Sequence, residues 1–440
     1  MSLSPSPATK TAAERASAIR SQLPEGGLFS GHDWRMSPDP FPIGNDLADE
    51  FEKLGRLLLQ FYRAANLLYR QSAAGKQPEW VARWLDLGKP RWLIELQRHA
   101  AWKNDLPRVI RPDVLLTENG FSLTELDSVP GGIGLTAWMN ETYSGDLIGG
   151  KGMTEGFAEI FGSAAAVHIV VSEESATYRP EMEWLSRRLG SSRFQVRRPD
   201  FTDFADGDAV YRFFELFDTA NVPCATRLFE MATEKRISLT PPPKPFFEEK
   251  MLFALLWNRN LRDFWRQELG ESFFERLLRI VPCTWVMDPL PLPPHAAIPE
   301  LNLTDWRQLK QFSQRQRDLI IKVSGFSELA WGGRGVHLGS DSSAEEWSVT
   351  VERALASFEQ SPYVVQRFHK SRLVKHEWFD FAENQSRVME GRARLCPYYF
   401  VSGEGDSARA KLGGVLATIC PADKKIIHGM KDAILAPCVR

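Results

Sequence analysis

Cysteine and histidine are both scarce in this chain of 440 residues, and neither is arranged to hold a metal. The five cysteines are far apart and include no CxxC pair, and the eight histidines include no HExxH pair. An odd number of separated cysteines argues against a disulfide framework and against structural zinc, and it favours a reducing compartment.

The chain also lacks a large net charge of either sign, and it lacks a long apolar run. With 54 basic and 56 acidic residues, its formal charge is −2, so electrostatics favour neither a nucleic-acid nor a membrane partner. The apolar stretch from Ala164 to Val171 is far too short to cross a bilayer. Residues Met1 to Thr11 have no apolar signal-peptide region, so we expect a cytoplasmic protein.

What is present is an ordinary globular composition, with 43% hydrophobic and 25% charged residues. The length exceeds that of a single ordinary core, so we expect several packed parts. Apolar residues at helical spacing between Leu47 and Gln71 predict an amphipathic helix. Further on, Ala165–Val171, Arg179–Leu189 and Phe194–Val196 predict a strand, a helix and a strand of a βαβ unit.

We therefore divide the chain into four parts. They are an N-terminal helical segment that packs on the core, a part with a charged hairpin, a small doubly wound α/β subdomain, and a C-terminal part suited to a nucleotide. Their expected bounds are residues 1–104, 105–160, 161–245 and 246–440.

Three carboxylates and one arginine lie on two short segments that are joined by a turn. The first segment carries Arg111 and Asp113, the turn is Glu118-Asn119-Gly120, and the second segment carries Glu125 and Asp127. In a hairpin with this three-residue loop, Asp113 pairs with Glu125, Arg111 pairs with Asp127, and all four share one face. A loop of only Asn119 and Gly120 would instead put Asp113 and Glu125 on opposite faces.

Carboxylates crowded on one face repel each other unless a cation lies between them. Their oxygens are the ligands that Mg²⁺ prefers, and this ion is usually shared with substrate phosphates. The first register therefore favours a magnesium site on the hairpin. The alternative is a hairpin whose charges lie on a solvated face.

A second group of residues, in the last third of the chain, suits a nucleotide. Lys322 lies within the apolar stretch Leu319–Val323, which predicts a buried strand, and a buried ammonium is costly unless an anion meets it. The glycines at 325, 332, 333 and 335 follow, and their backbone N–H groups could wrap phosphate oxygens. Because no helix directly follows them, this is neither a Walker A loop nor a dinucleotide motif.

Two later strands add polar groups to this half of the chain. The backbone of the predicted strand Tyr363–Phe368, around Gln366, could hydrogen-bond an adenine edge. Arg392 and Arg394 alternate onto one face of a further strand. They could hold a phosphate or a substrate carboxylate, or they could lie on an exposed strand face.

The order of these features resembles the circularly permuted ATP-grasp ligases, above all glutathionylspermidine synthase and its bacterial relatives. That family has an Arg-x-Asp strand before a Glu-x-Asn strand, which is similar to Arg111-Pro112-Asp113 and Glu125-Leu126-Asp127. It has a lysine that opens a helix, similar to Lys250–Trp257, and a lysine–glycine loop, similar to Lys322–Gly335. The likeness spans roughly residues 105 to 400.

The resemblance implies a mixed α/β protein with a circularly permuted ATP-grasp fold. It implies an ATP-dependent ligase that joins a small-molecule or peptide carboxylate to an amine through an acyl phosphate, with ATP and Mg²⁺ as cofactors. The implied metal ligands are Asp113, Glu125 and Asp127. The implied ATP-binding residues are Lys250, Lys322, Gly325, Gly332, Gly333, Gly335 and Gln366, and the implied catalytic residues are Arg111 and Arg334.

The chain departs from the family pattern at two places. Asp127 stands where the family has Asn, which adds charge to the implied metal site, and the glycine loop is longer by Phe326–Trp331. These departures leave open a nucleotide-binding scaffold without ligase turnover. A phosphotransferase that stops after phosphorylating its acceptor is a further alternative.

Overall fold

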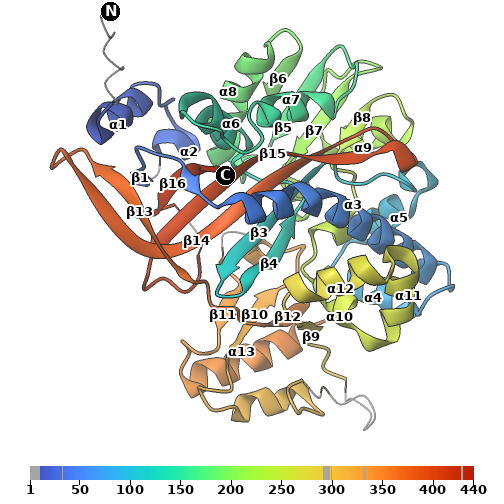
Figure 1. Cartoon of the computed structure of the whole chain (residues 1–440). Helices are drawn as coiled ribbons and strands as arrows, with labels where there is room; N and C mark the ends of the chain where they lie inside the picture. The colour runs from blue at the N-terminus through green and yellow to red at the C-terminus, as the bar shows by residue number, and fades with distance from the viewer. Residues whose placement is uncertain (1–9, 32, 291–297, 299, 331–332, 428–429) are drawn as a thin grey trace, which may run out of the picture.

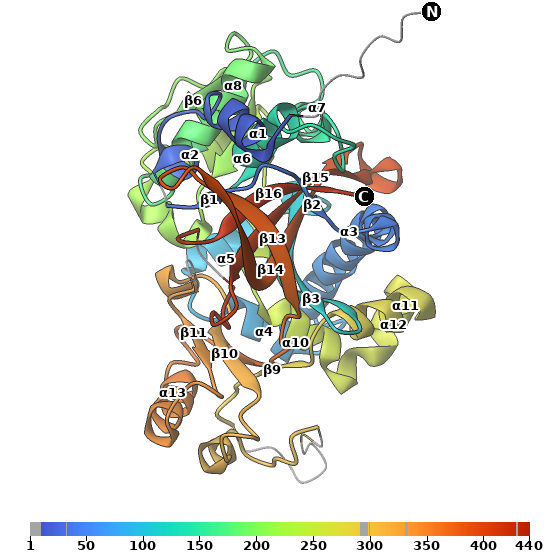
Figure 2. The ribbon, with the colours of Figure 1, turned by 60° about the vertical axis from the view of Figure 1, so that its left-hand side comes forward.

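The computed structural model describes residues 10–31, 33–290, 298, 300–330, 333–427 and 430–440, which form three sheets with helices packed around them. A large sheet lies between a parallel sheet, at the top of Figures 1 and 2, and a small antiparallel sheet at the bottom. The protein is thus a mixed α/β structure. Among the helices formed by the described residues, none is both long and apolar enough for a membrane span.

The large sheet has the order β1-β16-β15-β14-β3-β4, with β13 paired to β14 and β2 paired to β16. Its strands are β1 (Arg35–Met36), β2 (Phe41–Pro42), β3 (Val109–Thr117), β4 (Gly120–Asp127), β13 (Leu373–Asp380), β14 (Gln385–Ser402), β15 (Arg409–Pro421) and β16 (Ile434–Val439). The N-terminal segment therefore contributes two short strands, β1 and β2, beyond the helices expected there.

One long helix, α3 (Asn45–Ala73), covers a face of this sheet and confirms the helix expected over 47–71. Its apolar residues face inward because they recur at helical spacing, and Leu54, Leu58 and Phe61 are fully buried. At Gly55 an added Cβ would lie 2.6 Å from the Tyr399 ring, so glycine permits the close approach. The other N-terminal helices are α1 (Ala12–Arg20), α2 (Gly27–Ser30), α4 (Glu79–Asp86) and α5 (Arg91–Arg98).

The second sheet is parallel throughout, in the order β6-β5-β7-β8. Its strands are β5 (Val167–Val171), β6 (Phe194–Arg197), β7 (Ala209–Phe213) and β8 (Ser238–Thr240), and the helices near it are α6 (Ile133–Thr142), α7 (Gly152–Glu159), α8 (Arg179–Leu189) and α9 (Ala225–Thr233). The βαβ unit expected from the sequence is confirmed as β5, α8 and β6, because β5 pairs in parallel with β6.

The small antiparallel sheet has the order β11-β10-β12-β9 and is covered by α13 (Ala344–Ala356). Its strands are β9 (Thr284–Val286), β10 (Leu319–Val323), β11 (Val336–Leu338) and β12 (Tyr363–Arg367). Three helices, α10 (Met251–Trp257), α11 (Arg262–Leu269) and α12 (Glu271–Ile280), connect the parallel sheet to it. The start of α10 and the end of β10 are both turned toward the β3–β4 hairpin.

Candidate functional site

The hairpin brings the predicted residues together, although its loop differs from the prediction. Asp113 pairs with Glu125 and Arg111 pairs with Asp127, as expected. The loop, however, has only two residues, Glu118 and Asn119, because Thr117 already pairs with Gly120. The register then shifts at a bulge, so that Val114 pairs with Leu123 and Asp113 with Glu125.

That bulge leaves Thr124 without a direct cross-strand partner. An extra residue of this kind turns its backbone groups away from the strand ladder. The Thr124 carbonyl accepts a hydrogen bond from Lys322 Nζ at 3.2 Å. The bulge therefore restores the pairing of the carboxylates, and it also provides a hydrogen-bond acceptor for Lys322 of the small sheet.

A cavity of about 560 Å³ lies where the hairpin, α10 and the small sheet meet. Most of the residues expected to bind ATP, the metal or the acceptor contribute to its wall. They are Arg111, Asp113, Glu125, Asp127, Lys250, Lys322, Gly325, Gly333 and Gln366. Segments far apart in the sequence thus form one polar cavity.

At one end of this cavity, which we call the arginine end, two arginines face two carboxylates. Arg111 Nη2 lies 3.3 Å from an oxygen of Asp113 and 2.9 Å from one of Asp127. Arg394 Nη1 lies 3.0 Å from the other oxygen of Asp113. Burial acts to lower the pKa of both guanidiniums, but Asp113 together with the other acidic groups around them raises the pKa of both arginines.

The arginine end also retains unused donors. The Nε–H groups of Arg111 and Arg394 are buried and have no hydrogen-bond partner among the described residues. A buried donor without an acceptor costs free energy. These two unused donors make the arginine end suitable for a hydrogen-bond acceptor such as a carboxylate oxygen.

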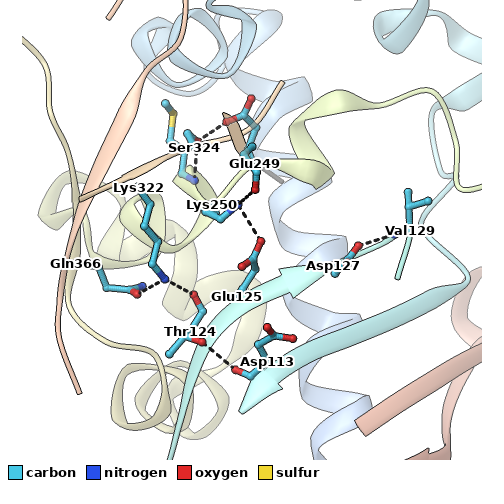
Figure 3. A network of polar contacts seen from close by, with 12 residues as sticks. Asp113, Thr124, Glu125, Asp127, Val129, Glu249, Lys250, Lys322, Ser324 and Gln366 are labelled. Carbon is cyan, nitrogen blue, oxygen red and sulfur yellow. Dashed lines mark hydrogen bonds and ion pairs between the residues drawn. The ribbon is translucent and has the colours of Figure 1, made fainter. Parts of the chain in front are cut away.

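The other end, the lysine end, has two ammonium groups, and one of them pairs with the Glu125 carboxylate. Lys250 Nζ lies 2.8 Å from Glu125 Oε1, and Lys322 Nζ donates to Gln366 Oε1 at 3.0 Å (Figure 3). Burial lowers the pKa of Lys322 to about 8. For Lys250, burial also acts to lower the pKa, but Glu125, with Glu249 and Asp127, raises the pKa above its usual value.

Gln366 contacts the lysine end of the cavity through its side chain, while its backbone belongs to the small sheet. β12 lies between β10 and β9, so its backbone is hydrogen-bonded on both edges. The amide side chain lines the cavity, accepts from Lys322 and donates to Thr284 at 2.9 Å, and the backbone contact to adenine that we expected at Gln366 stays a prediction.

The glycines of the loop after β10 have different roles. An added Cβ at Gly325 would lie 2.6 Å from the Glu248 carbonyl oxygen, and one at Gly335 would lie 2.6 Å from that of Leu329. Close packing therefore requires glycine at both positions, whether or not a phosphate binds there. Gly333 has φ +72°, which favours glycine, and Gly332 lies outside the described residues.

Two predicted residues lie away from the cavity wall. Arg334 is half exposed and pairs with Glu174 at 2.9 Å, and neither it nor Gly335 lines the cavity. Conversely, Arg394 and Cys396 line it beside Asp113. The alternation of Arg392 and Arg394 on one strand was the available sequence signal, but it could not tell which face would be enclosed.

Three consecutive residues, Glu248, Glu249 and Lys250, connect the lysine end to its surroundings. Glu248 pairs with Arg212 of β7 at 2.6 Å. Glu249 pairs with Lys89 at 2.5 Å, fully buried, and also accepts from the Ser324 hydroxyl before the glycine loop. Lys250 reaches the hairpin, so its position is fixed by contacts to the parallel sheet, the N-terminal helices and the small sheet.

The hairpin carboxylates could hold a magnesium ion only if a bound ligand supplied further oxygen atoms to it. Among the described residues, no group of three or more His, Cys, Asp or Glu side chains is arranged to hold a metal. The Asp127 carboxylate accepts from the Val129 N–H at 2.8 Å (Figure 3). It also pairs with Arg111. Mg²⁺ takes one or two protein carboxylates and completes its shell with water and phosphate oxygens. The cross-strand pair Asp113 and Glu125 is engaged too, by Arg111 and Arg394 and by Lys250.

No protein-family model matches this chain, and no curated protein matches it. Its structure is similar to that of a glutathione synthetase-like effector from Globodera pallida, in its apo form, with a TM-score of 0.55, 10% identity, and coverage of 97% of this chain and 94% of that chain. A candidate gamma-glutamylcysteine synthetase from Methylobacillus flagellatus gives a TM-score of 0.39 at 10% identity, over 85% of this chain and 87% of that chain. That score is below the level at which a shared fold can be inferred. The first likeness establishes the fold alone: this chain has a mixed α/β fold similar to that of the glutathione synthetase-like effector.

Proposed function

We propose that this protein is an ATP-dependent ligase that activates a carboxylate as an acyl phosphate and transfers the acyl group to an amine. The observation that carries the proposal is the cavity, in which a lysine end with excess positive charge adjoins an arginine end with unused donors. Such an arrangement suits a polyphosphate beside a second anion. The synthetase-like fold supports it, and the order of hairpin before nucleotide-binding part resembles that of the circularly permuted type.

In the proposed reaction, the protein acts by positioning and by neutralising charge. Lys250 and Lys322 would hold phosphate oxygens at the lysine end, and Arg111 with Arg394 would hold the acceptor carboxylate. A carboxylate oxygen then forms a bond to the γ-phosphorus as the bond from phosphorus to the ADP oxygen breaks. The amine nitrogen next attacks the acyl carbon, which releases phosphate and a proton and leaves an amide.

Asp113 and Glu125 would hold Mg²⁺ together with phosphate oxygens, once an arginine contact of Asp113 is given up. Asp127 would join them only by giving up its contact to Val129 or Arg111. When bound, the ion would supply positive charge to the phosphoryl oxygens. Because Glu125 also pairs with Lys250, metal binding and phosphate binding would be linked at this one carboxylate.

A nucleotide-binding scaffold without turnover is the second candidate, and a specific observation favours it. Both oxygens of Asp113 are already paired with arginines, and Asp127 adds a further carboxylate where the resembling family has an amide. A scaffold would keep the lysine end intact while the arginine pairs replace the metal.

Single-turnover assays with hydroxylamine separate the two candidates. A ligase incubated with ATP, Mg²⁺ and a library of carboxylates should form ADP and a hydroxamate in equal amounts, because hydroxylamine traps the acyl phosphate. The E125Q variant should bind ATP but form neither product. Binding of ATP without ADP formation from any carboxylate would exclude the ligase and support the scaffold.

A further inference from the structure

One face of the large sheet forms the floor of the cavity, and the strand register shows how its polarity changes. Glu125 on β4 pairs with Asp113 on β3, whose carboxylate contacts Arg394 on β14. Arg394 in turn pairs across the ladder with Thr418 on β15. From β4 to β14, the side chains on this face that line the cavity include the carboxylates and guanidiniums of the candidate site.

Beyond β14 the same face carries no charge at the positions that line the cavity. Cys396 pairs with Leu416, and Thr418 pairs with Leu435 of β16. Leu416, Thr418 and Leu435 all belong to the cavity wall and are buried. The floor therefore changes from charged to uncharged within two strands, and Arg394 marks the boundary.

The roof above these strands is uncharged as well. Gly132, at φ +88°, precedes α6, and an added Cβ there would lie 2.5 Å from Tyr398 Oη and 3.8 Å from a methyl carbon of Leu416. The start of α6 is thus packed directly on the floor. Leu135 of α6 and Leu28 of α2 line the same cavity and belong to one hydrophobic cluster with Leu416.

Charged side chains also line the cavity from the segment that follows β15. Lys424, Lys425 and Lys431 line the cavity from this segment. Lys425 pairs with the exposed Asp341, and Lys424 Nζ donates to the Lys431 carbonyl at 2.9 Å. Lys425 and Lys431 are exposed and Lys424 is partly exposed, so these lysines lie at the rim, where water can solvate them.

We propose that the carboxylate substrate has an uncharged, largely apolar body next to its carboxylate. The inference rests on the proposed function, which places the reacting carboxylate beside the phosphate and hence at the arginine end. The rest of the molecule then extends over Leu416, Thr418 and Leu435. An ionic group in that position would lose its water without gaining a partner, which costs several kcal/mol in general.

Three six-carbon acids test this in the unmodified protein, because they differ only at the end opposite the reacting carboxylate. Hexanoate ends there in an uncharged methyl group, adipate in a second carboxylate, and 6-aminohexanoate in an ammonium group. We expect kcat/KM for hydroxamate formation with hexanoate to exceed the values for the other two by at least about tenfold. ATP binding, measured by calorimetry, accompanies each assay.

The outcomes separate the inference from the function on which it rests. Preference for adipate, for 6-aminohexanoate or for amino acids over hexanoate would overturn the apolar body while leaving the ligase in place. ATP binding with no hydroxamate from any carboxylate would overturn the proposed ligase and the inference with it.

A substitution in the floor gives a second, independent measurement. Leu416→Lys should shift the preference from hexanoate toward adipate, because the new ammonium gives the second carboxylate a partner. Leu416→Met is the matched control and should keep the preference for hexanoate, since it preserves volume and polarity. Unfolding curves of both variants show whether each is folded, and an unchanged preference in a folded Leu416→Lys protein would contradict the inference.

Discussion

At the arginine end of the cavity two guanidiniums face two carboxylates, whereas at the lysine end two ammonium groups face one. Arg111 and Arg394 are bound to Asp113 and Asp127 in a connected ion-pair network. Among the described residues, Lys322 instead donates to the Gln366 side-chain oxygen and to the Thr124 carbonyl oxygen. The Glu125 carboxylate pairs with Lys250. The first end is balanced in charge within the protein, while the second has an excess that a ligand can neutralise.

This difference predicts that the two ends of the cavity contribute differently to folding stability and to ligand binding. Removing one member of a buried ion pair leaves its partner charged and desolvated, so the balanced end should matter most for folding. Removing an ammonium that has no carboxylate partner relieves a desolvation cost, so the unbalanced end should matter most for ligand affinity. Four predictions test this division, in order of expected effect.

Arg394→Met should lower the free energy of unfolding by about 3–5 kcal/mol, because Asp113 loses a buried partner. Urea denaturation measures this loss. The control is Arg387→Met, which breaks a half-exposed pair with Asp380 and should cost no more than about 1 kcal/mol. Equal losses in the two variants would mean that the arginine end is not a buried network.

Lys322→Met should weaken ATP binding by about 10- to 100-fold, since a hydrogen bond to a charged group contributes about 1.5–3 kcal/mol. Its free energy of unfolding should change by less than about 1 kcal/mol, because no carboxylate is left unpaired. Calorimetry with ATP and urea denaturation give the two values. Lys370→Met, at an exposed lysine, is the control and should leave both unchanged. An unaltered affinity in Lys322→Met would remove this lysine from the ATP site.

ATP affinity should fall as the pH rises through about 8, because burial lowers the pKa of Lys322 to about 8 and the neutral amine no longer attracts phosphate. The Lys322 contribution to folding has the opposite sign. In the folded protein this lysine loses its proton below its unfolded value of 10.5, so its contribution to stability increases with pH between about 8 and 10.5.

Lys322→Arg separates these effects, because arginine keeps its charge over the whole range. Comparing the pH profiles of ATP affinity for this variant and the unmodified protein isolates the contribution of Lys322. The decline above pH 8 should disappear in Lys322→Arg. If both proteins show the same decline, another group is responsible.

Arg334→Ala should have the smallest effect, with ATP affinity changed less than about twofold and stability by less than about 0.5 kcal/mol. This arginine pairs with Glu174 at the surface and does not line the cavity. Calorimetry and urea denaturation measure both quantities. A large loss of affinity would instead support the catalytic role that the sequence motif implied.

The sequence predicted the elements whose signals are local. The apolar spacing of α3 and the alternation of strand and helix in β5, α8 and β6 follow from residues close together in the chain. Lys322 was found because its neighbours on β10 are all apolar, and a strand of that kind is buried wherever it packs. The pairing of Asp113 with Glu125 was also predicted, although from a three-residue loop that the hairpin does not have.

Tertiary structure decided what depends on residues distant in the chain. The bulge at Thr124 repairs the register and meets Lys322, which comes from a different sheet. Arg394 faces Asp113 because β14 lies beside β3, and the burial of β12 between two strands directs Gln366 to act through its side chain. Spacing along the chain fixes which side chains share a face, but only the packing of sheets determines which face encloses a cavity. Charge, burial and hydrogen-bond partners at the site follow from that packing.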